Sequence, residues 1–486
     1  MFDDTIAAIA TPLGEGGLAV IRISGPQTLA VAEQVFLPVG KNSRKPSEAT
    51  THTIHYGKVM RAGQQVDEVL LSVMRAPRTN TREDVVEIAC HGGLLSAKAV
   101  LDTVLASGAR LALPGEFTRR AFLNGRLDLT QAEAVADLIH SRTELALRAA
   151  NEQLAGKLSR RINQLRDDLM NVLAHVEAHI DFPEEDIAPD THAQLVQRLE
   201  HAMAFMDELL RTANEGRILR RGIRAAIVGR PNAGKSSLLN QLLGHDRAIV
   251  SAVPGTTRDT IEEMANVRGL PVVFVDTAGL REARDEIESE GIRRSHQSLA
   301  AAEFILHVLD ASEPLTVADE KYLDEFAGKK RILVRNKVDL PVKLVLPASM
   351  NRKVGRVTPC APGTAATGDG GWGAEIESRA AHAVIDVCCL TSLGIEQLKD
   401  AIKELVWSGE VRAEMLEVMI NSRHQNALMR TRNAVSLALS GFCEGATLEL
   451  VAVDLRIAVN AVGEIVGKTT TEDLLDSIFS QFCIGK

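Results

Sequence analysis

Gly229-Arg-Pro-Asn-Ala-Gly-Lys-Ser236 is the stretch that decides the fold of a large part of this chain. It has the pattern GxxxxGK[ST], follows the apolar run AAIV at 225–228 and precedes SSLLNQLLG, which has helical spacing. Glycines let backbone N–H groups curl around phosphates, and the helix that follows points its positive end at them. The segment therefore predicts a P-loop between a strand and a helix, in a parallel sheet with crossover helices.

Phosphate and Mg²⁺ binding depend on further residues around this loop. Lys235 is expected to reach the β- and γ-phosphates, and the Ser236 hydroxyl is expected to ligate Mg²⁺. Asp276 ends the apolar run at 272–276 and would hold Mg²⁺ through water, with Thr257 as the second direct ligand. The predicted phosphate-side residues are Asn232, Ala233, Gly234, Lys235, Ser236, Ser237, Ser251, Ala252, Val253, Pro254, Gly255, Thr256, Thr257, Asp276, Thr277, Ala278 and Gly279.

The choice of base is indicated by Asn336-Lys337-Val338-Asp339, directly after the apolar run at 331–335. An aspartate accepts both the N1–H and the exocyclic amine of guanine, and adenine presents no such pair of donors. The last base-contacting loop of a GTPase usually begins Ser-Ala, whereas Cys388-Cys389-Leu390 stands here. Its backbone amides are still predicted to meet guanine O6, but the lost serine leaves the affinity for GTP open.

Hydrolysis must proceed without the glutamine that many GTPases carry after the motif Asp-Thr-Ala-Gly, because Leu280 occupies that position. Another polar group must orient the attacking water, and the segment 281–291 supplies several acids. Charge in the transition state must also be neutralised by an arginine finger or a cation. Asn232 is either a ligand for a monovalent cation or only a loop-forming residue.

The chain divides into segments of different periodicity. At 486 residues it is too long for a single core. Residues 1–120 form a mixed α/β pattern with strands expected at 18–25, 67–74 and 83–93, and residues 127–214 have helical spacing. Residues 223–405 alternate strand and helix, and the chain is helical again after Trp407. We therefore predict domains at 1–120, 121–217, 218–405 and 406–486, with the third inserted into a helical domain. The glycine-rich part of 343–381 is interpreted as a mobile insertion, with a partner-binding loop as the alternative.

Composition narrows the function classes. The net charge is −9, and the six cysteines form no CxxC pair, which argues against a zinc site or a disulfide framework. No apolar run is long enough to span a membrane, and the N-terminus has no basic segment typical of a signal peptide, so a cytoplasmic protein is expected. Five arginines form either a nucleic-acid patch or a solvated helix end: Arg211, Arg217, Arg220, Arg221 and Arg224.

Taken together, the motifs resemble the MnmE (TrmE) family of tRNA-modification GTPases over nearly the full length. The N-terminal and helical segments that carry the resemblance are DTIAAIATPLGEGGLAVIRISG (4–25), CHGG (90–93), PGEFTRRAFLNGRLDLTQAEAVADLI (114–139), DFPEED (181–186) and FCIGK (482–486). The nucleotide-binding segments are GRPNAGKSSLLN (229–240), PGTTRD (254–259) and DTAGLREA (276–283).

The resemblance implies a fold and a reaction. It implies an N-terminal folate-binding and dimerising domain, and a helical domain that carries an inserted GTPase domain. Members act in a heterotetrameric complex with an FAD-dependent MnmG-type partner. They add an aminomethyl-type (carboxymethylaminomethyl) group to C5 of the wobble uridine of certain tRNAs. A 5,10-methylene- or 5-formyl-tetrahydrofolate is the implied one-carbon source, and GTP hydrolysis is implied to require Mg²⁺ and K⁺.

The resemblance also implies roles for single residues. K⁺ would be bound by Asn232, Ser251, Val253 and Thr256. Glu288 matches the acid that positions water, and it is the predicted catalytic residue beside Lys235. Folate would lie near Arg22, Glu87, Arg126 and Lys486. Cys483 is a candidate for the uridine-modification chemistry, with a buried structural thiol as the competing interpretation.

Two other functions remain open from the residues. A regulatory GTPase that only binds, such as a ribosome-assembly factor, would need no folate site in residues 1–120. A P-loop kinase or ATPase is opposed by Asn336-Lys337-Val338-Asp339.

Overall fold

The computed structural model describes residues 2–40, 44–181, 189–244, 262–275, 299–347, 383–407 and 418–486. These residues form two compact units. Unit 1 comprises Met1–Ile139, Ala150–Arg211 and Ser422–Lys486, and unit 2 comprises His140–Ala149 and Thr212–Asn421. Unit 1 is therefore built from segments on both sides of unit 2.

A seven-stranded sheet with the strand order β3-β4-β5-β6-β2-β1-β7 forms the N-terminal part of unit 1. Its strands are β1 (Ile6–Ile9), β2 (Gly16–Ser24), β3 (Phe36–Pro38), β4 (Thr53–Arg61), β5 (Gln64–Met74), β6 (Val85–Gly92) and β7 (Arg110–Leu111). All pairs are antiparallel except β1 with β7. Alternate residues of β2, such as Ile21 and Ile23, point into a core shared with α1 (Thr28–Val35) and α2 (Leu94–Ala106).

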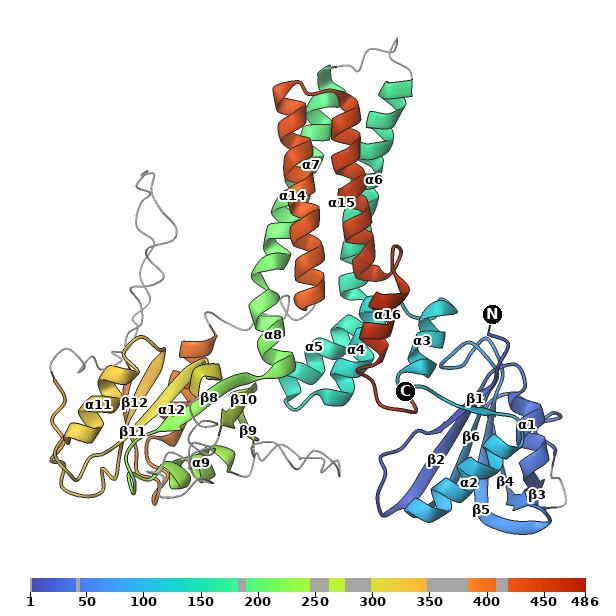
Figure 1. Ribbon diagram of the computed structural model, residues 1–486, viewed down its shortest axis with the longest axis horizontal. Helices are drawn as coiled ribbons and strands as arrows, with labels where there is room; N and C mark the ends of the chain where they lie inside the picture. Colours follow the sequence, from blue (N-terminus) through green and yellow to red (C-terminus); the bar gives the residue numbers. More distant parts are fainter. Residues whose placement is uncertain are drawn as a thin grey trace, which may run out of the picture. The chain divides into compact units, whose positions relative to one another are not determined.

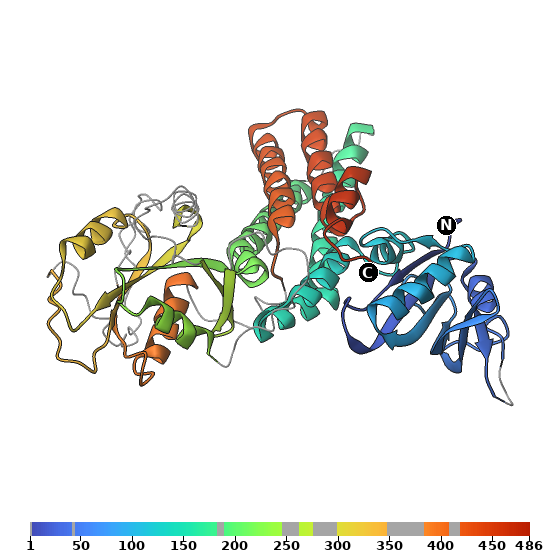
Figure 2. The same ribbon diagram turned by 60° about the horizontal axis from the view of Figure 1, so that its bottom comes forward.

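The rest of unit 1 is helical, with α3 (Glu116–Leu123), α4 (Leu129–His140), α6 (Lys157–Asp181), α7 (Pro189–Arg211), α14 (Ser422–Glu444), α15 (Leu448–Val466) and α16 (Glu472–Phe479). The short helix α5 (Glu144–Leu154) crosses from unit 2 into unit 1. Figures 1 and 2 show α6, α7, α14 and α15 side by side, in agreement with the contacts of α15 with α6 and of α14 with α7. Buried residues recur at helical spacing along α6, as at Leu158, Ile162 and Leu165. The bundle therefore joins helices from before and after unit 2.

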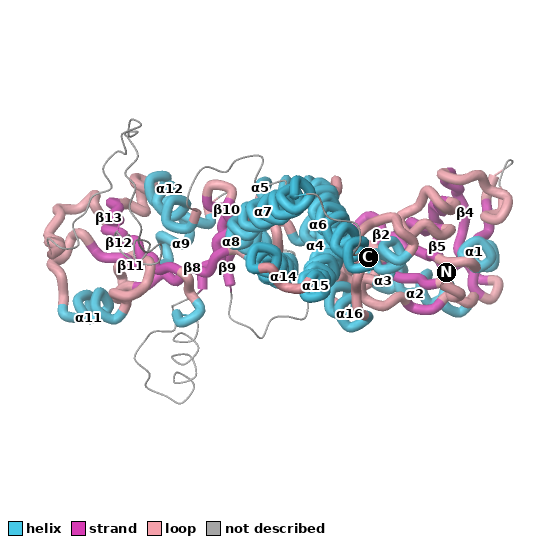
Figure 3. The backbone as a smooth tube through the Cα atoms, turned by 90° about the horizontal axis from the view of Figure 1, so that it is seen from above, coloured by secondary structure: helices cyan, strands magenta, loops and turns pink. Residues whose placement is uncertain are grey.

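Unit 2 contains a six-stranded sheet in the order β13-β12-β11-β8-β10-β9, parallel except for β9. The strands are β8 (Ile223–Val228), β9 (Glu262–Val267), β10 (Leu270–Val275), β11 (Phe304–Asp310), β12 (Arg331–Asn336) and β13 (Ala383–Asp386). The helices are α8 (Ala213–Arg221), α9 (Lys235–Leu243), α11 (Val317–Glu325) and α12 (Ile395–Val406). Because side chains alternate along a strand, Ala225 and Ile227 of β8 pack with α9 and α12, and Ala226 and Val228 pack on the other face beside α11. Figure 3 shows α11 and α12 on opposite sides of these strands.

The predicted fold class is confirmed: a mixed α+β N-terminal part, a helical part and a P-loop GTPase part with a mainly parallel sheet. The strands predicted at 18–25, 67–74 and 83–93 are β2, β5 and β6, with ends shifted by a few residues. The exact domain boundaries stay a prediction.

Candidate functional sites

The predicted nucleotide residues gather at one edge of the sheet in unit 2. The parallel strands β8, β12 and β13 all end at this edge. The P-loop follows β8, Asn336 is the last residue of β12, and Cys388 comes shortly after β13. In open parallel sheets, ligands bind in the crevice outside the carboxyl ends of the strands. The topology therefore brings the phosphate-side and base-side segments together.

Two glycines of the P-loop stand where a side chain has no room. A Cβ atom on Gly229 would lie 2.2 Å from Val308 O, and one on Gly234 would lie 2.1 Å from the Asn336 amide nitrogen. Gly234 has a φ of 96° and directly precedes α9, whose first residue is Lys235. Asn232 has a φ of 64° and is exposed. The backbone thus curls as a phosphate-binding loop requires.

The cationic and hydroxyl groups of the loop are placed at the start of α9. Lys235 Nζ donates to Gly229 O at 2.7 Å and to Arg230 O at 2.8 Å, so its ammonium lies over the loop. Ser236 and Ser237 are exposed in the first turn of the helix. An ammonium and helical N–H groups at one point are the hydrogen-bond donors that a triphosphate requires, and an exposed serine hydroxyl can ligate its metal ion.

Asn336 joins the phosphate side to the base side. Its side chain is buried, and Nδ2 donates to Ala233 O at 2.9 Å while Oδ1 accepts from Cys389 N at 3.4 Å. One amide therefore connects the P-loop with the Cys388–Leu390 loop. Gln241 of α9 adds a second connection, because its Nε2 donates to Cys389 O at 2.8 Å. Sequence reasoning missed Gln241, since no motif includes it.

The other residues of the base-reading motif differ in their surroundings. Lys337 Nζ lies 2.6 Å from Asp310 Oδ2, at the end of β11. Burial raises the pKa of Asp310, but hydrogen bonds from Lys337 and Ser312 outweigh this and hold it below its usual value. Asp339 is exposed and available to a base.

Two backbone N–H groups of the Cys388–Leu390 loop already have hydrogen-bond partners. Cys388 N donates to Leu393 O at 2.9 Å, and Cys389 N donates to Asn336. The N–H of Leu390, whose side chain is 88% exposed, remains as the candidate for guanine O6. Burial, with the neighbouring Cys388, raises the pKa of the Cys389 thiol to about 11, so this thiol stays neutral. Among the described residues, no three His, Cys, Asp or Glu side chains gather to hold a metal ion.

Several predicted nucleotide residues lie outside the described residues. They are Ser251, Ala252, Val253, Pro254, Gly255, Thr256, Thr257, Asp276, Thr277, Ala278, Gly279 and Glu288. Leu280 and most of the 343–381 insertion lie there as well. Of the predicted K⁺ ligands, the described residues include Asn232.

A second group of predicted residues meets at the C-terminus of the chain, in unit 1. Arg22 and Glu87 are register partners on β2 and β6, with Arg22 Nε 2.8 Å from Glu87 Oε1. Arg22 Nη1 also donates to Gly485 O at 3.2 Å. Lys486 O accepts from Phe117 N at 3.1 Å, which ties the terminal residue to α3. The prediction that Arg22 and Glu87 lie on strands is confirmed.

The remaining two predicted residues of this site, Arg126 and Cys483, are both exposed. Burial lowers the pKa of Arg126, and the positive charges of Arg22 and Arg82 lower it further, so Arg126 lies near both. Cys483 is exposed, so the interpretation of Cys483 as a buried structural thiol is wrong. Its carbonyl accepts from Gly115 N at 3.4 Å, which positions the C-terminal segment beside α3.

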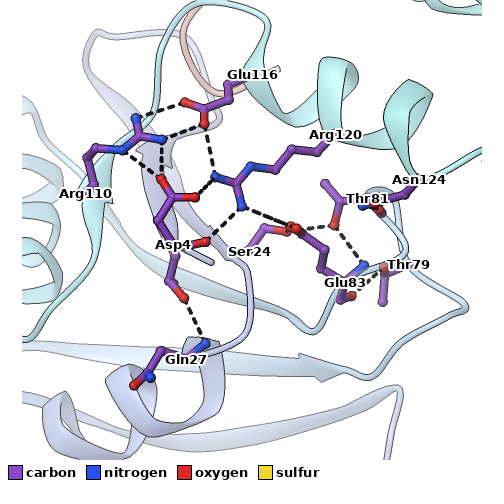
Figure 4. A network of polar contacts seen from close by, with 11 residues as sticks. Asp4, Ser24, Gln27, Thr79, Thr81, Glu83, Arg110, Glu116, Arg120 and Asn124 are labelled. Carbon is purple, nitrogen blue, oxygen red and sulfur yellow. Dashed lines mark hydrogen bonds and ion pairs between the residues drawn. The ribbon is translucent and has the colours of Figure 1, made fainter. Parts of the chain in front are cut away.

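A partly buried ionic network next to this site was missed by sequence reasoning (Figure 4). Arg120 is fully buried and pairs with Asp4 at 2.7 Å, Glu116 at 3.1 Å and Glu83 at 3.3 Å. Arg110 pairs with Asp4 at 2.6 Å and with Glu116 at 2.7 Å. Burial raises the pKa of Glu116, but its bonds to Arg110, Leu113 N and Arg120 hold it below its usual value, so this carboxylate is charged. The network fixes the N-terminus, the loop before β6 and α3 to one another.

Two further findings concern the expectations from composition. Within the described ranges, no helix has the length and apolar character needed to cross a bilayer. Arg217 Nη2 lies 2.6 Å from Glu303 Oε1, which favours the helix-end interpretation for this arginine.

Comparison with known proteins gives the family. A family model described as the MnmE helical domain matches residues 129–483, and one described as the GTP-binding protein TrmE N-terminus matches residues 5–126. The tRNA modification GTPases MnmE of Geobacillus thermodenitrificans and Geobacillus kaustophilus are 46% and 45% identical to this chain, covering 99% of it and 99% of each relative. That of Listeria innocua is 44% identical, with the same coverage of both chains. The chain therefore belongs to the MnmE (TrmE) family of tRNA modification GTPases.

Proposed function

We propose that this protein is a K⁺-dependent GTPase that, with an FAD-dependent MnmG-type partner, adds a carboxymethylaminomethyl-type group to C5 of the wobble uridine of certain tRNAs. It would act in the cytoplasm as a homodimer within a heterotetrameric complex. The observation that supports this beyond GTP hydrolysis is the Arg22–Glu87 pair beside the C-terminus, at 2.8 Å. A GTPase that only switches has no use for such a second polar site.

On the nucleotide side, each residue has a proposed task. Lys235 and the amides of Gly234 and Ser236 bind phosphate oxygens, and Asp339 accepts the two N–H donors of guanine. Ser236 and Thr257 would hold Mg²⁺. K⁺ would be held by Asn232, Ser251, Val253 and Thr256. Together the two ions would stabilise the negative charge that develops between the β- and γ-phosphates. Asn232 fits this role, because it is exposed and its side-chain oxygen can bind a cation. Glu288 would orient the attacking water.

On the C-terminal side, the residue types fit a tetrahydrofolate. Arg22 occupies one oxygen of Glu87, so the other oxygen can accept an N–H donor from a pterin ring. Arg126 and Lys486 supply positive charge for carboxylates at the other end of the molecule. Cys483, exposed beside this group, is the proposed residue for the uridine chemistry. Folate when bound supplies the one-carbon unit.

The proposal is tested by mass spectrometry of wobble nucleosides in tRNA from a strain that lacks this gene. We expect the modified uridine to disappear and to return with the wild-type gene but not with Lys235→Ala. Glu325→Ala, an exposed acid on α11, is the matched control and should restore modification. Unchanged wobble nucleosides in the deletion strain would reject the tRNA assignment and favour a GTPase that only binds.

The cation role is tested by GTP turnover in KCl and NaCl at equal ionic strength. We expect faster turnover in K⁺ for the wild type, and no difference between the salts for Asn232→Ala. Equal wild-type rates in the two salts would contradict the K⁺ mechanism and point to an arginine finger.

A further inference from the structure

Arg82, a residue with no assigned role, is held in an unusual conformation beside the proposed folate site. Its φ is 62°, in the left-handed region that arginine seldom adopts. The next residue, Glu83, is bonded to Ser24 Oγ at 2.7 Å and to Arg120 at 3.3 Å, and its carbonyl accepts from Thr79 at 2.7 Å (Figure 4). Such a conformation persists where the surroundings over-determine it. The bonds of Glu83 to this network therefore fix where Arg82 projects from the loop.

The loop that contains Arg82 and the turn that contains Arg126 are hydrogen-bonded to each other in both directions. Arg82 Nη1 donates to Asn124 O at 3.0 Å, and Arg126 Nη1 donates to Asn80 O at 2.6 Å. Between these two bonds, Asn124 Nδ2 donates to Thr81 O at 2.7 Å. The two exposed guanidinium groups are thus held close together. Each arginine donates from Nη1 to a backbone carbonyl. Its Nε and Nη2 groups form the edge that can bind a carboxylate in a bidentate manner.

The charges of this pair are not balanced within the described part of the chain. Neither Arg82 nor Arg126 is within ion-pair distance of a carboxylate there, whereas Arg22 is paired with Glu87. The positive charges of Arg22 and Arg82 add to the effect of burial in lowering the pKa of Arg126. Two like charges held together in this way repel each other, and a ligand with two negative groups would relieve the repulsion.

We propose that Arg82 is an additional ligand-binding residue, and that Arg82 and Arg126 together bind the two carboxylates of the glutamate tail of a tetrahydrofolate. The inference rests on the proposed function and names the part of the ligand that this pair recognises. A folate ends in a glutamate with two carboxylates, which matches two neighbouring guanidinium groups. Because Glu87 on β6 is assigned to the pterin ring, the ligand would extend from β6 toward the turn at 124–126, where its glutamate tail would lie.

The test combines a protein change with a ligand change. Binding of 5-formyltetrahydrofolate and of 5-formyltetrahydropteroate, which lacks the glutamate, is measured by calorimetry for the wild type and Arg82→Asn. Asparagine tolerates the left-handed conformation, so the loop should keep its shape. We expect Arg82→Asn to weaken 5-formyltetrahydrofolate binding roughly five- to tenfold, the range of an exposed but bidentate ion pair, and to leave the pteroate unchanged. Arg61→Asn, an exposed arginine at the end of β4, is the matched control and should change neither.

The outcomes separate this inference from the proposed function. Equal loss of both ligands, or loss of neither, would overturn the assignment of Arg82 to the tail. Failure of the wild type to bind either ligand would instead contradict the proposed folate site itself. Arg82→Gly, which relaxes the backbone fully, is measured beside Arg82→Asn with the thermal midpoint of each. The same ligand-specific loss in both variants at unchanged midpoints shows that the lost guanidinium is the cause.

Discussion

The two candidate sites are assembled in different ways. In unit 2, the residues proposed to bind phosphate come from one continuous segment, Gly229–Ser236, between β8 and α9. In unit 1, the residues proposed to bind folate come from the separate positions 22, 87, 126 and 486. Arg22 and Glu87 meet because β2 pairs with β6, and residues 485 and 486 are anchored beside β2 and α3. A continuous loop carries its geometry in its own backbone, whereas a site made of distant segments depends on how those segments are anchored to one another. The two sites should therefore respond differently to small changes.

The largest effect is expected from Gly234→Ala in the P-loop. The new Cβ would lie 2.1 Å from the Asn336 amide at a φ of 96°, so both the backbone and a buried hydrogen bond must change. A strained left-handed residue and a lost buried bond each cost about 1–3 kcal/mol, which together predict on the order of a 100- to 1000-fold loss of GTP affinity. Fluorescent GTP titration measures this. Gly328→Ala, where a Cβ meets nothing within 4 Å, is the control. Nucleotide binding at wild-type affinity in Gly234→Ala would show that the loop is not the phosphate site.

The next largest effect is expected on the rate of GTP hydrolysis, with GTP affinity unchanged. Glu288→Ala should lower the GTP turnover rate about 100-fold, the range of general acid–base or water-positioning catalysis, and leave GTP affinity nearly intact. Single-turnover hydrolysis and a binding titration on the same preparation separate the two quantities. Glu325→Ala serves again as the control. A variant that hydrolyses at the normal rate would exclude Glu288 as the water-positioning group.

The two candidate sites differ in how far the sequence alone predicts them. The P-loop, the strand before it and the base-reading motif are local patterns, so the sequence predicted these segments and the parallel sheet that carries them. The sequence did not predict that Asn336 bridges Ala233 and Cys389, because these contacts depend on which strands pair with each other in the sheet. The Arg120 network was equally out of reach, since Asp4, Glu83 and Glu116 become neighbours only through tertiary packing. Arg22, Glu87, Arg126 and Lys486 were predicted through family resemblance and not from any spacing.

A smaller effect is expected at the base. Asp339→Asn presents a donor where guanine needs an acceptor, and a mismatched polar pair costs about 1–3 kcal/mol, or roughly tenfold in affinity. The preference should move from GTP toward xanthosine triphosphate, which competition titrations with the two nucleotides will measure. Asp324→Asn, an exposed aspartate on α11, should not change it. Unaltered GTP affinity in Asp339→Asn would mean that another group reads the base.

The smallest effect is expected from Gly485→Ala, the counterpart in unit 1 of the P-loop substitution. Its geometry is as tight, since the φ is 95° and a Cβ would lie 2.3 Å from Ile9 O. The consequence should nevertheless be milder, because Gly485 and Lys486 contribute backbone hydrogen bonds that anchor this site, whereas Gly234 stands in the loop that itself is proposed to bind the phosphates. Moving residues 485 and 486 removes the Gly485 carbonyl from Arg22 and the Lys486 carbonyl from Phe117, and leaves the Arg22–Glu87 pair in place. We expect roughly three- to tenfold weaker binding of 5-formyltetrahydrofolate, the size of one or two lost hydrogen bonds, and unchanged GTP affinity. Gly17→Ala on β2, where a Cβ meets nothing within 4 Å, is the control. A loss of folate binding as large as the loss of GTP binding in Gly234→Ala would show that the segment around Gly485 is as rigid a part of its site as the P-loop, and the contrast between the two sites would then fail.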